Sequence, residues 1–207
     1  MLELQGSLFD TVDDDAGFAP LAEAHRLPLG PGAWLDLLPG WLHGADAVFD
    51  TLLTDVPWRA ERRQMYERVV DVPRLTAFYD EGAPLPHPAL AEARERLSAH
   101  YAAELGEPFV TVGLCLYRDG RDSVAWHGDT FGRGRHQDTM VAIVSLGDPR
   151  RLVLRPRGGG SSIAVPLGHG DLVVMGGSCQ RTWEHAVPKQ AAAGPRVSVQ
   201  FRPLNVF

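Results

Sequence analysis

The sequence predicts a mainly β protein with flanking helices, of the sandwich or jelly-roll class. After Pro108, eight short segments are rich in β-branched and aromatic residues, as strands are. Gly, Pro, Asp and Arg residues typical of turns separate these segments, and one long helical pattern precedes them. At 207 residues the chain is long enough to bury a substantial core in one domain.

The elements before this β region are expected in the following order. Residues 1–25 predict a flexible acidic tail, because they contain the run Asp13–Asp15 and no apolar periodicity. From Gly32 to Leu53, apolar residues recur at helical spacing around Pro39 and Gly40, which predicts two short amphipathic helices covering a sheet. Residues 57–88 predict short strands and turns, and residues 89–105, rich in Ala, Glu, Leu and Arg, predict a helix behind the main sheet. The expected strands are residues 109–117, 123–129, 139–147, 151–157, 161–168, 171–177, 185–188 and 196–203.

A candidate metal site begins in the second of these strands. Residues two apart in a strand point to the same face, so His127 and Asp129 can offer an imidazole and a carboxylate to one ion. His185, in QRTWEHAVP, is the candidate third ligand. Two histidines and one carboxylate with open positions suit Fe(II) that also binds a cosubstrate and oxygen.

Two arginines follow the third candidate ligand. Arg196 and Arg202 lie in the segment RVSVQFR, where positions 196, 198, 200 and 202 share one strand face. Two guanidinium groups pointing into one cavity require an anion. A small dicarboxylic acid that chelates the metal would supply it, because Arg forms two-pronged pairs with carboxylates.

The ordered motifs HGD, HGDLVVMGG, WEHAVP and RVSVQFR resemble those of the AlkB family of Fe(II)- and 2-oxoglutarate-dependent dioxygenases, in particular its DNA-repair branch. The resemblance runs from Trp58 to Pro203 and implies a double-stranded β-helix, the jelly roll, over residues 108–203 of a dioxygenase domain spanning residues 26–207. It implies Fe(II), 2-oxoglutarate and O2 as cofactor and cosubstrates. The implied metal ligands and catalytic residues are His127, Asp129 and His185, and the implied 2-oxoglutarate contacts are Tyr117, Arg196, Arg202 and the residue at position 115. The family carries Asn at that last position, where this chain has Cys115.

The resemblance also implies that residues 57–88 form a lid that grips the target nucleotide. Arginines and aromatic residues alternate there, as binding of single-stranded or flipped bases requires. Core packing of any one aromatic residue is an equally good interpretation. The candidate substrate contacts are Arg74, Tyr66, Met65, Phe78 and Tyr79, with Arg133 in the loop beside the metal site.

The net charge of −6 is unevenly distributed along the chain. Residues 1–55 hold ten acidic residues and one basic residue, Arg26, whereas the remainder holds nineteen basic and sixteen acidic residues. All basic residues except Lys189 are Arg, a side chain that pairs with phosphate and stacks on bases. A genomic bias towards Arg codons explains the same composition equally well.

The sequence predicts a cytoplasmic protein with no membrane partner. No apolar run approaches membrane-spanning length, and the N-terminus lacks the features of a signal peptide. Cys115 and Cys179 are too few for a disulfide framework, and a reducing compartment suits ferrous iron. Residues Gln5–Phe9 (QGSLF) resemble the peptide by which many bacterial repair proteins dock on the DNA sliding clamp; packing of Leu8 and Phe9 on the protein's own domain is the alternative.

The function implied by the resemblance is oxidative demethylation of N-alkylated bases in DNA, with RNA left open as a second substrate. Hydroxylation of the methyl group, coupled to conversion of 2-oxoglutarate to succinate and carbon dioxide, releases formaldehyde. Some repair members carry an acidic residue just after the HxD motif that contacts the damaged base, whereas Thr130 and Phe131 stand here, so lesion preference stays open. Two other functions also stay open: the same chemistry on a protein, tRNA or small molecule, and a non-catalytic jelly-roll binding module.

Overall fold

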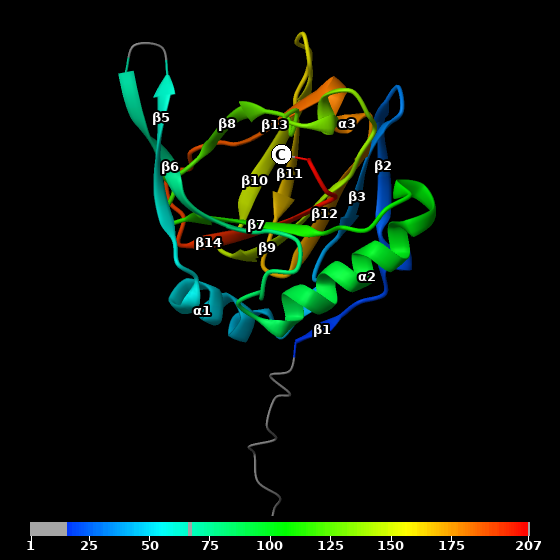
Figure 1. Ribbon diagram of the computed structural model, residues 1–207. Coiled ribbons are helices and arrows are strands. Elements are labelled where there is room, and N and C mark those ends of the chain that lie inside the picture. The colour runs from blue at the N-terminus through cyan, green and yellow to red at the C-terminus, as the bar shows by residue number, and fades with distance from the viewer. Residues whose placement is uncertain (1–15, 66–67, 207) are drawn as a thin grey trace, which may run out of the picture.

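Two antiparallel sheets pack face to face in the computed structural model, which describes residues 16–65 and 68–206 and the side chains outside residues 62–71. In Figure 1 the smaller sheet lies above the larger one, and two helices lie below it. The strand order of the larger sheet is β2 (His25–Gly30), β3 (Ala33–Leu38), β12 (Asp171–Gly177), β9 (Val141–Gly147), β14 (Arg196–Arg202), β7 (Thr111–Tyr117), β6 (Arg68–Tyr79) and β5 (Arg59–Met65). That of the smaller sheet is β11 (Ile163–Leu167), β10 (Arg150–Pro156), β13 (Trp183–Val187) and β8 (Val124–His127).

Short elements complete the fold. A two-stranded pair joins β1 (Gly17–Phe18) to β4 (Leu42–His43). The helices are α1 (Ala45–Asp55), α2 (Pro88–Leu105) and α3 (Cys179–Thr182), and two 3-10 turns span Leu21–Glu23 and Arg133–Arg135. In the part of the chain that is described, no helix combines the length and the apolar character needed to cross a bilayer.

The strand that carries Arg196 shows how alternation divides the interior. Val197, Val199 and Phe201 point to one face of β14 and join the core that also contains the buried residues of α1 and α2. Arg196, Ser198, Gln200 and Arg202 point to the other face and line a cavity between the sheets. The two-residue period of a strand therefore separates a dry core from a polar cavity within one segment.

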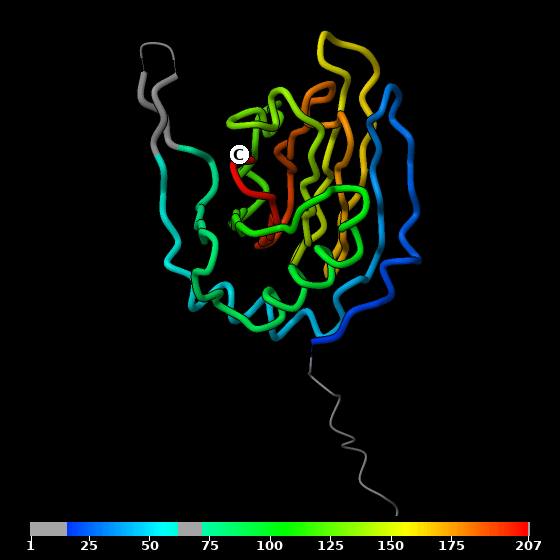
Figure 2. Tube along the Cα trace, turned by 45° about the vertical axis from the view of Figure 1, so that its right-hand side comes forward, coloured from blue at the N-terminus to red at the C-terminus, as the bar shows by residue number. Residues whose placement is uncertain are grey.

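The predicted β class is confirmed, since each of the eight segments expected after Pro108 contains a strand, and the helix expected at 89–105 is α2. His87 precedes α2 and accepts a hydrogen bond from the backbone N–H of Ala89 through Nδ1, so it caps the helix. Within the expected range 57–88, β5 and β6 pair as a long antiparallel hairpin, at the left of Figures 1 and 2.

Two predictions made from the sequence are wrong in detail. The first of the two helices expected between residues 32 and 53 is the strand β3, and only the second, α1, is a helix. Both faces of β3 pack against other residues, so its near-continuous apolar pattern mimics helical spacing. The expected tail to residue 25 also extends too far, because Phe18 pairs with Leu42 and lies beside the Trp41 ring at 4.8 Å. Gln5–Phe9 lies outside the described residues.

A buried carboxylate fastens α2 to the larger sheet. Asp36 of β3 is 4% exposed and accepts hydrogen bonds from Arg26 at 2.7 Å and from the hydroxyl of Tyr101 at 2.9 Å. Arg26 also stacks on the Trp34 ring at 3.6 Å. Burial, together with the charge of Asp36, raises the pKa of Tyr101 well above its ordinary value, so the hydroxyl stays protonated and donates. This network joins β2, β3 and α2.

Replacing Tyr101 by Phe should lower the free energy of unfolding by about 1 kcal/mol, because Asp36 loses one buried hydrogen bond while the ring still packs. Urea denaturation of the two proteins measures this difference. Tyr79→Phe is the matched control, since no described residue accepts a hydrogen bond from the Tyr79 hydroxyl. An equal decrease in the free energy of unfolding in both variants would show that the hydrogen bond to Asp36 does not contribute to stability.

Candidate metal centre

Three potential ligands converge at one edge of the smaller sheet. His127 ends β8, Asp129 follows two residues later, and His185 lies in the middle of β13. His127 and His185 are direct cross-strand partners, and their ring centroids are 4.2 Å apart. The ligand atoms of all three residues lie within 4.8 Å of one another. Among the described residues, this is the one cluster of three or more His, Cys, Asp or Glu side chains close enough to hold a metal ion.

Asp129 reaches the cluster from a loop, whereas the sequence predicts a strand that continues through residue 129. β8 stops at His127 because the backbone of Gly128 packs against the chain around α3. A Cβ atom on Gly128 would lie 2.8 Å from the carbonyl oxygen of Gln180, so only glycine fits there without a shift. The backbone N–H of Asp129 then donates to the side-chain oxygen of Gln180 at 3.0 Å. Gln180 thus fixes the backbone of Asp129, and no motif in the sequence indicates this contact.

The protonation states of the cluster suit a cation. The Nδ1 of His127 lies 2.9 Å from the carbonyl oxygen of Ala125, which can only accept, so Nδ1 carries the proton and Nε2 is left with its lone pair. Burial lowers the pKa of His185 to about 3, which keeps this imidazole neutral. Burial would raise the pKa of Asp129, but the opposing charge of Arg202, with His185 and His127, holds it at about 2.

Arg202 has a contact that the sequence does not reveal. Its Nε donates to Oδ2 of Asp129 at 2.9 Å, and both side chains are largely buried. This bond fixes one carboxylate oxygen and leaves the other for a metal. Two imidazoles and one ionised, oriented carboxylate fit a divalent ion with open coordination positions, and Fe(II) takes such a set.

A buried arginine lies deeper in the same cavity. Arg196 is 2% exposed; its Nε donates to the hydroxyl of Ser145 at 2.8 Å, and its Nη1 is buried without a partner. Tyr117 faces it across the β7–β14 pair, with the guanidinium 5.2 Å from the ring centroid. Burial raises the pKa of Tyr117 to about 12, so its hydroxyl remains a donor at neutral pH. An unpartnered buried guanidinium nitrogen calls for an anionic ligand.

An amide stands close to the position that differs from the AlkB pattern. Cys115 lies opposite Ser198 in the β7–β14 register. The side-chain nitrogen of Gln200 donates to the hydroxyl of Ser198 at 2.7 Å, and its oxygen is 3.8 Å from the Cys115 sulfur. All three side chains line the cavity. Gln200 and Ser198 were missed as site residues in the sequence, although their shared face with Arg196 was a usable signal.

The cavity measures about 1030 Å³, which exceeds the space that a small dicarboxylic acid needs. Of the candidate substrate contacts, Arg74, Phe78 and Tyr79 line it from β6. Arg133 does not line it, because its guanidinium is bound to Glu107 and to the carbonyl oxygen of Leu204. The side chains of Met65 and Tyr66 lie outside the described ones. Trp126 and Phe131 also line the cavity, although neither was a candidate.

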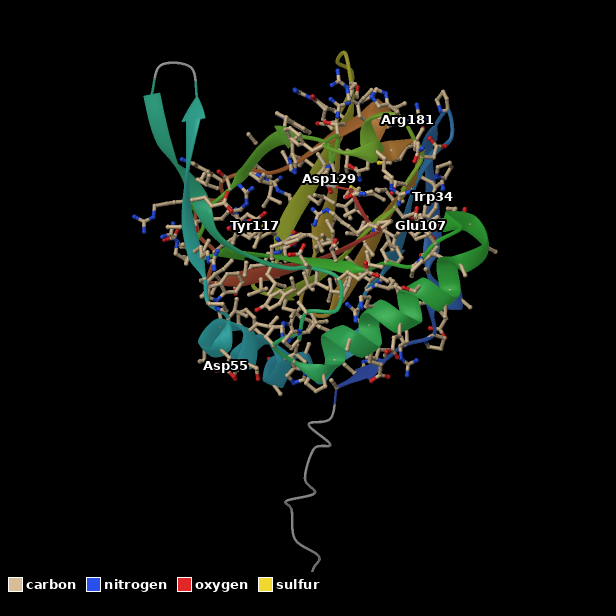
Figure 3. All side chains as sticks on the ribbon, in the orientation of Figure 1. Trp34, Asp55, Glu107, Tyr117, Asp129 and Arg181 are labelled. Atoms are coloured by element: carbon tan, nitrogen blue, oxygen red, sulfur yellow. The ribbon has the colours of Figure 1, made fainter. Side chains whose placement is uncertain are left out.

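Figure 3 labels Asp129 and Tyr117, which come from the two sides of this cavity. The candidate metal ligands belong to β8, β13 and the loop after β8, whereas Tyr117, Ser145 and Arg196 belong to β7, β9 and β14. The sequence profile described as the 2OG-Fe(II) oxygenase superfamily matches residues 35–202, which include all of these strands. The chain belongs to this superfamily.

Curated relatives with AlkB-type names are similar to the chain. The alpha-ketoglutarate-dependent dioxygenase alkB homolog 3 of Homo sapiens is 32% identical over 194 residues, which cover 81% of this chain and 65% of the relative. The Bos taurus protein of the same name gives the same identity and coverage. The DNA oxidative demethylase ALKBH2 of Homo sapiens is 28% identical over 180 residues, covering 77% of this chain and 69% of the relative. The chain therefore spans just under two thirds of the alkB homolog 3 proteins.

Solved structures share the fold. OsALKBH1 superimposes with a TM-score of 0.58 at 16% identity, covering 86% of this chain and 99% of the other. A prolyl-4-hydroxylase from Pseudomonas putida gives a TM-score of 0.56 at 19% identity, covering 81% of this chain and 91% of the other. These similarities confirm the jelly-roll prediction.

Replacing His127 by Ala should weaken metal binding by at least about 100-fold, because one of three ligands is lost. Isothermal titration calorimetry of the apoprotein with Fe(II), under anaerobic conditions, measures the affinity for the metal. His136→Ala is the matched control, since His136 is exposed and lies outside the cluster. Unchanged affinity of the His127 variant would refute the assignment of the metal centre.

Proposed function

We propose that this protein is an Fe(II)- and 2-oxoglutarate-dependent dioxygenase that removes N-alkyl groups from bases in DNA, and in RNA where the strand is accessible. The observation that carries the proposal is one cavity with three kinds of lining. It holds a metal triad, a buried arginine with an unpaired Nη1, and an arginine- and aromatic-bearing hairpin along one side. The similarity to alkB homolog 3 and ALKBH2 supports the choice of substrate class.

His127, Asp129 and His185 are the proposed iron ligands, and each has a defined part in holding the metal. The hydrogen bond of His127 to Ala125 occupies Nδ1, so Nε2 would hold the ion, and the low pKa of Asp129 keeps its carboxylate ionised. Arg202 and Gln180 hold Asp129 in place, so the cluster is ordered before the metal arrives. When bound, Fe(II) and 2-oxoglutarate supply the oxidation of a C–H bond by O2.

Arg196 is the proposed partner of the far carboxylate of 2-oxoglutarate, with the hydroxyl of Tyr117 as a second donor. Ser145 holds Nε of the guanidinium, and Nη1 is buried without a partner beside the cavity that Arg196 lines. Arg202 is the proposed second cosubstrate arginine, while its Nε remains on Asp129. Cys115 is a poor hydrogen-bonding replacement for the Asn of the family, and the neighbouring Gln200 amide is the better polar group at that end.

The hairpin residues Arg74, Phe78 and Tyr79 are the proposed substrate contacts, together with Met65 and Tyr66. An alkylated base must leave its stack to reach the iron, so it requires an apolar or aromatic enclosure and nearby cationic groups. Arg74 supplies charge from β6, and Nη1 of its guanidinium approaches the carbonyl oxygen of Ser123 at 3.4 Å. The cavity volume accommodates a base in addition to the cosubstrate.

Docking of Gln5–Phe9 on a sliding clamp is proposed from the sequence motif alone, and a cytoplasmic location from the sequence features given above. Binding of the purified clamp to the full chain, compared with a Leu8→Ala, Phe9→Ala variant, tests it. Retention of clamp binding in that variant would refute the proposal.

Replacing Arg196 by Gln should abolish the stabilisation that 2-oxoglutarate confers, because the far carboxylate loses its charged partner. The midpoint of thermal unfolding with Mn(II), in the presence and absence of 2-oxoglutarate, measures this without turnover. Arg151→Gln is the matched control, since Arg151 is exposed and does not line the cavity. If 2-oxoglutarate raised the midpoint of thermal unfolding of the Arg196 variant as much as that of the wild type, the assignment of Arg196 as its carboxylate partner would be refuted.

The decisive experiment uses an oligonucleotide with one N1-methyladenine or N3-methylcytosine, incubated with the protein, Fe(II), ascorbate and 2-oxoglutarate. Mass spectrometry should show the loss of one methylene mass in the complete mixture, and no loss without 2-oxoglutarate or with the His127→Ala variant. Succinate release without any change in the oligonucleotide would favour a protein, tRNA or small-molecule substrate. Neither product, with iron bound, would favour the non-catalytic binding module.

A further inference from the structure

A second, smaller pocket of about 320 Å³ adjoins the metal loop and is lined by Thr130, Arg135, Arg157 and Arg181. This arginine pocket is connected to the metal centre through Gln180. The backbone carbonyl of Gln180 accepts a hydrogen bond from Arg157 at 3.2 Å, and its side chain accepts one from the backbone of Asp129. Thr130 directly follows Asp129 in the chain.

The charge around the arginine pocket is not balanced. Arg181 pairs with Asp138, and Arg157 lies 3.6 Å from Glu184, whose carboxylate Arg155 shares at 3.0 Å. Arg135 is exposed and forms neither a hydrogen bond nor an ion pair with any described residue. No carboxylate lines the pocket itself. Such a set of guanidinium groups binds phosphate well, because each presents several N–H donors in a plane.

An exposed aromatic ring lies on the same loop. Phe131 is 73% exposed, the highest value among the large apolar side chains that the structure describes as exposed. It lines the mouth of the main cavity, whereas its neighbour Thr130 lines the arginine pocket. An aromatic face beside a basic pocket is the combination that binds single-stranded nucleic acid, since the ring stacks on a base and arginines contact the backbone.

We propose that the arginine pocket binds one backbone phosphate of a single-stranded nucleic acid and that Phe131 stacks on an adjoining base. In Figure 3, Arg181 lies on the opposite side of Asp129 from the β5–β6 hairpin. The strand therefore crosses the cavity mouth, held by the hairpin on one flank and by this loop on the other. This inference rests on the proposed nucleic-acid substrate, and adds a second anchoring flank to it.

The test is the affinity of the full chain for an unmodified single-stranded oligonucleotide, measured by fluorescence anisotropy at a series of salt concentrations. The double variant Arg135→Ser, Arg181→Ser should bind about fivefold more weakly, and the plot of log affinity against log salt should be shallower by about 0.7, the value for one phosphate contact. The variant Phe131→Ser should bind about tenfold more weakly with an unchanged slope, because stacking releases no counterions.

The matched control is the double variant Arg96→Ser, Arg151→Ser, which removes the same charge from exposed sites outside both pockets. Its affinity and slope should stay within twofold of the wild type. An arginine-pocket variant with unchanged affinity and slope, or a control that loses as much, would overturn the inference. Because binding is measured without turnover, an absent demethylase activity would refute the proposed function while leaving this result decisive for the pocket.

Discussion

The pairing of β13 with β8 is the constraint on which the rest of the site depends. In its register His185 stands directly opposite His127, so two proposed ligands 58 positions apart in sequence become cross-strand neighbours. A slip of one residue would turn His185 to the other face, because side chains alternate along a strand. The third ligand depends on the end of this pair: Gly128 leaves the sheet in close contact with the chain at Gln180, and Asp129 turns back to the histidines.

Pairing of opposite charges lowers the free-energy cost of burying charged side chains in the cavity between the two sheets. Arg202 and Asp129 form a pair that is more than four-fifths buried at both side chains, which removes most of the cost of burying either charge alone. Arg196 lacks such a counterion: its Nε has Ser145, and its pKa falls below its ordinary value through burial. A carboxylate that bound to Arg196, as proposed, would supply the missing negative charge and stabilise the folded protein.

The larger sheet carries this cavity on one face and an apolar core on the other. Strand β14 shows both functions in seven residues, and its outer face packs on helices that the Arg26, Asp36 and Tyr101 network helps to hold. The smaller sheet supplies the histidines, and loops at its edge bring arginines to the surface. Proteins commonly hold functional side chains on rigid strands and vary the loops at the edge of the sheet, which determine specificity. Of the two proposed nucleic-acid-binding flanks, one is the β5–β6 hairpin and the other is the loop beside the arginine pocket.

Local patterns in the sequence determined the β class, the helix α2 and the shared face of Arg196 and Arg202, because strand and helix periods depend only on neighbouring residues. They failed at β3, where burial on both faces erased the two-residue period. Only the tertiary structure decided that Arg202 holds Asp129, that Gln180 orients it and that Arg133 turns away to Glu107. These are contacts between residues distant in sequence, and they depend on register and loop packing, which no local pattern encodes.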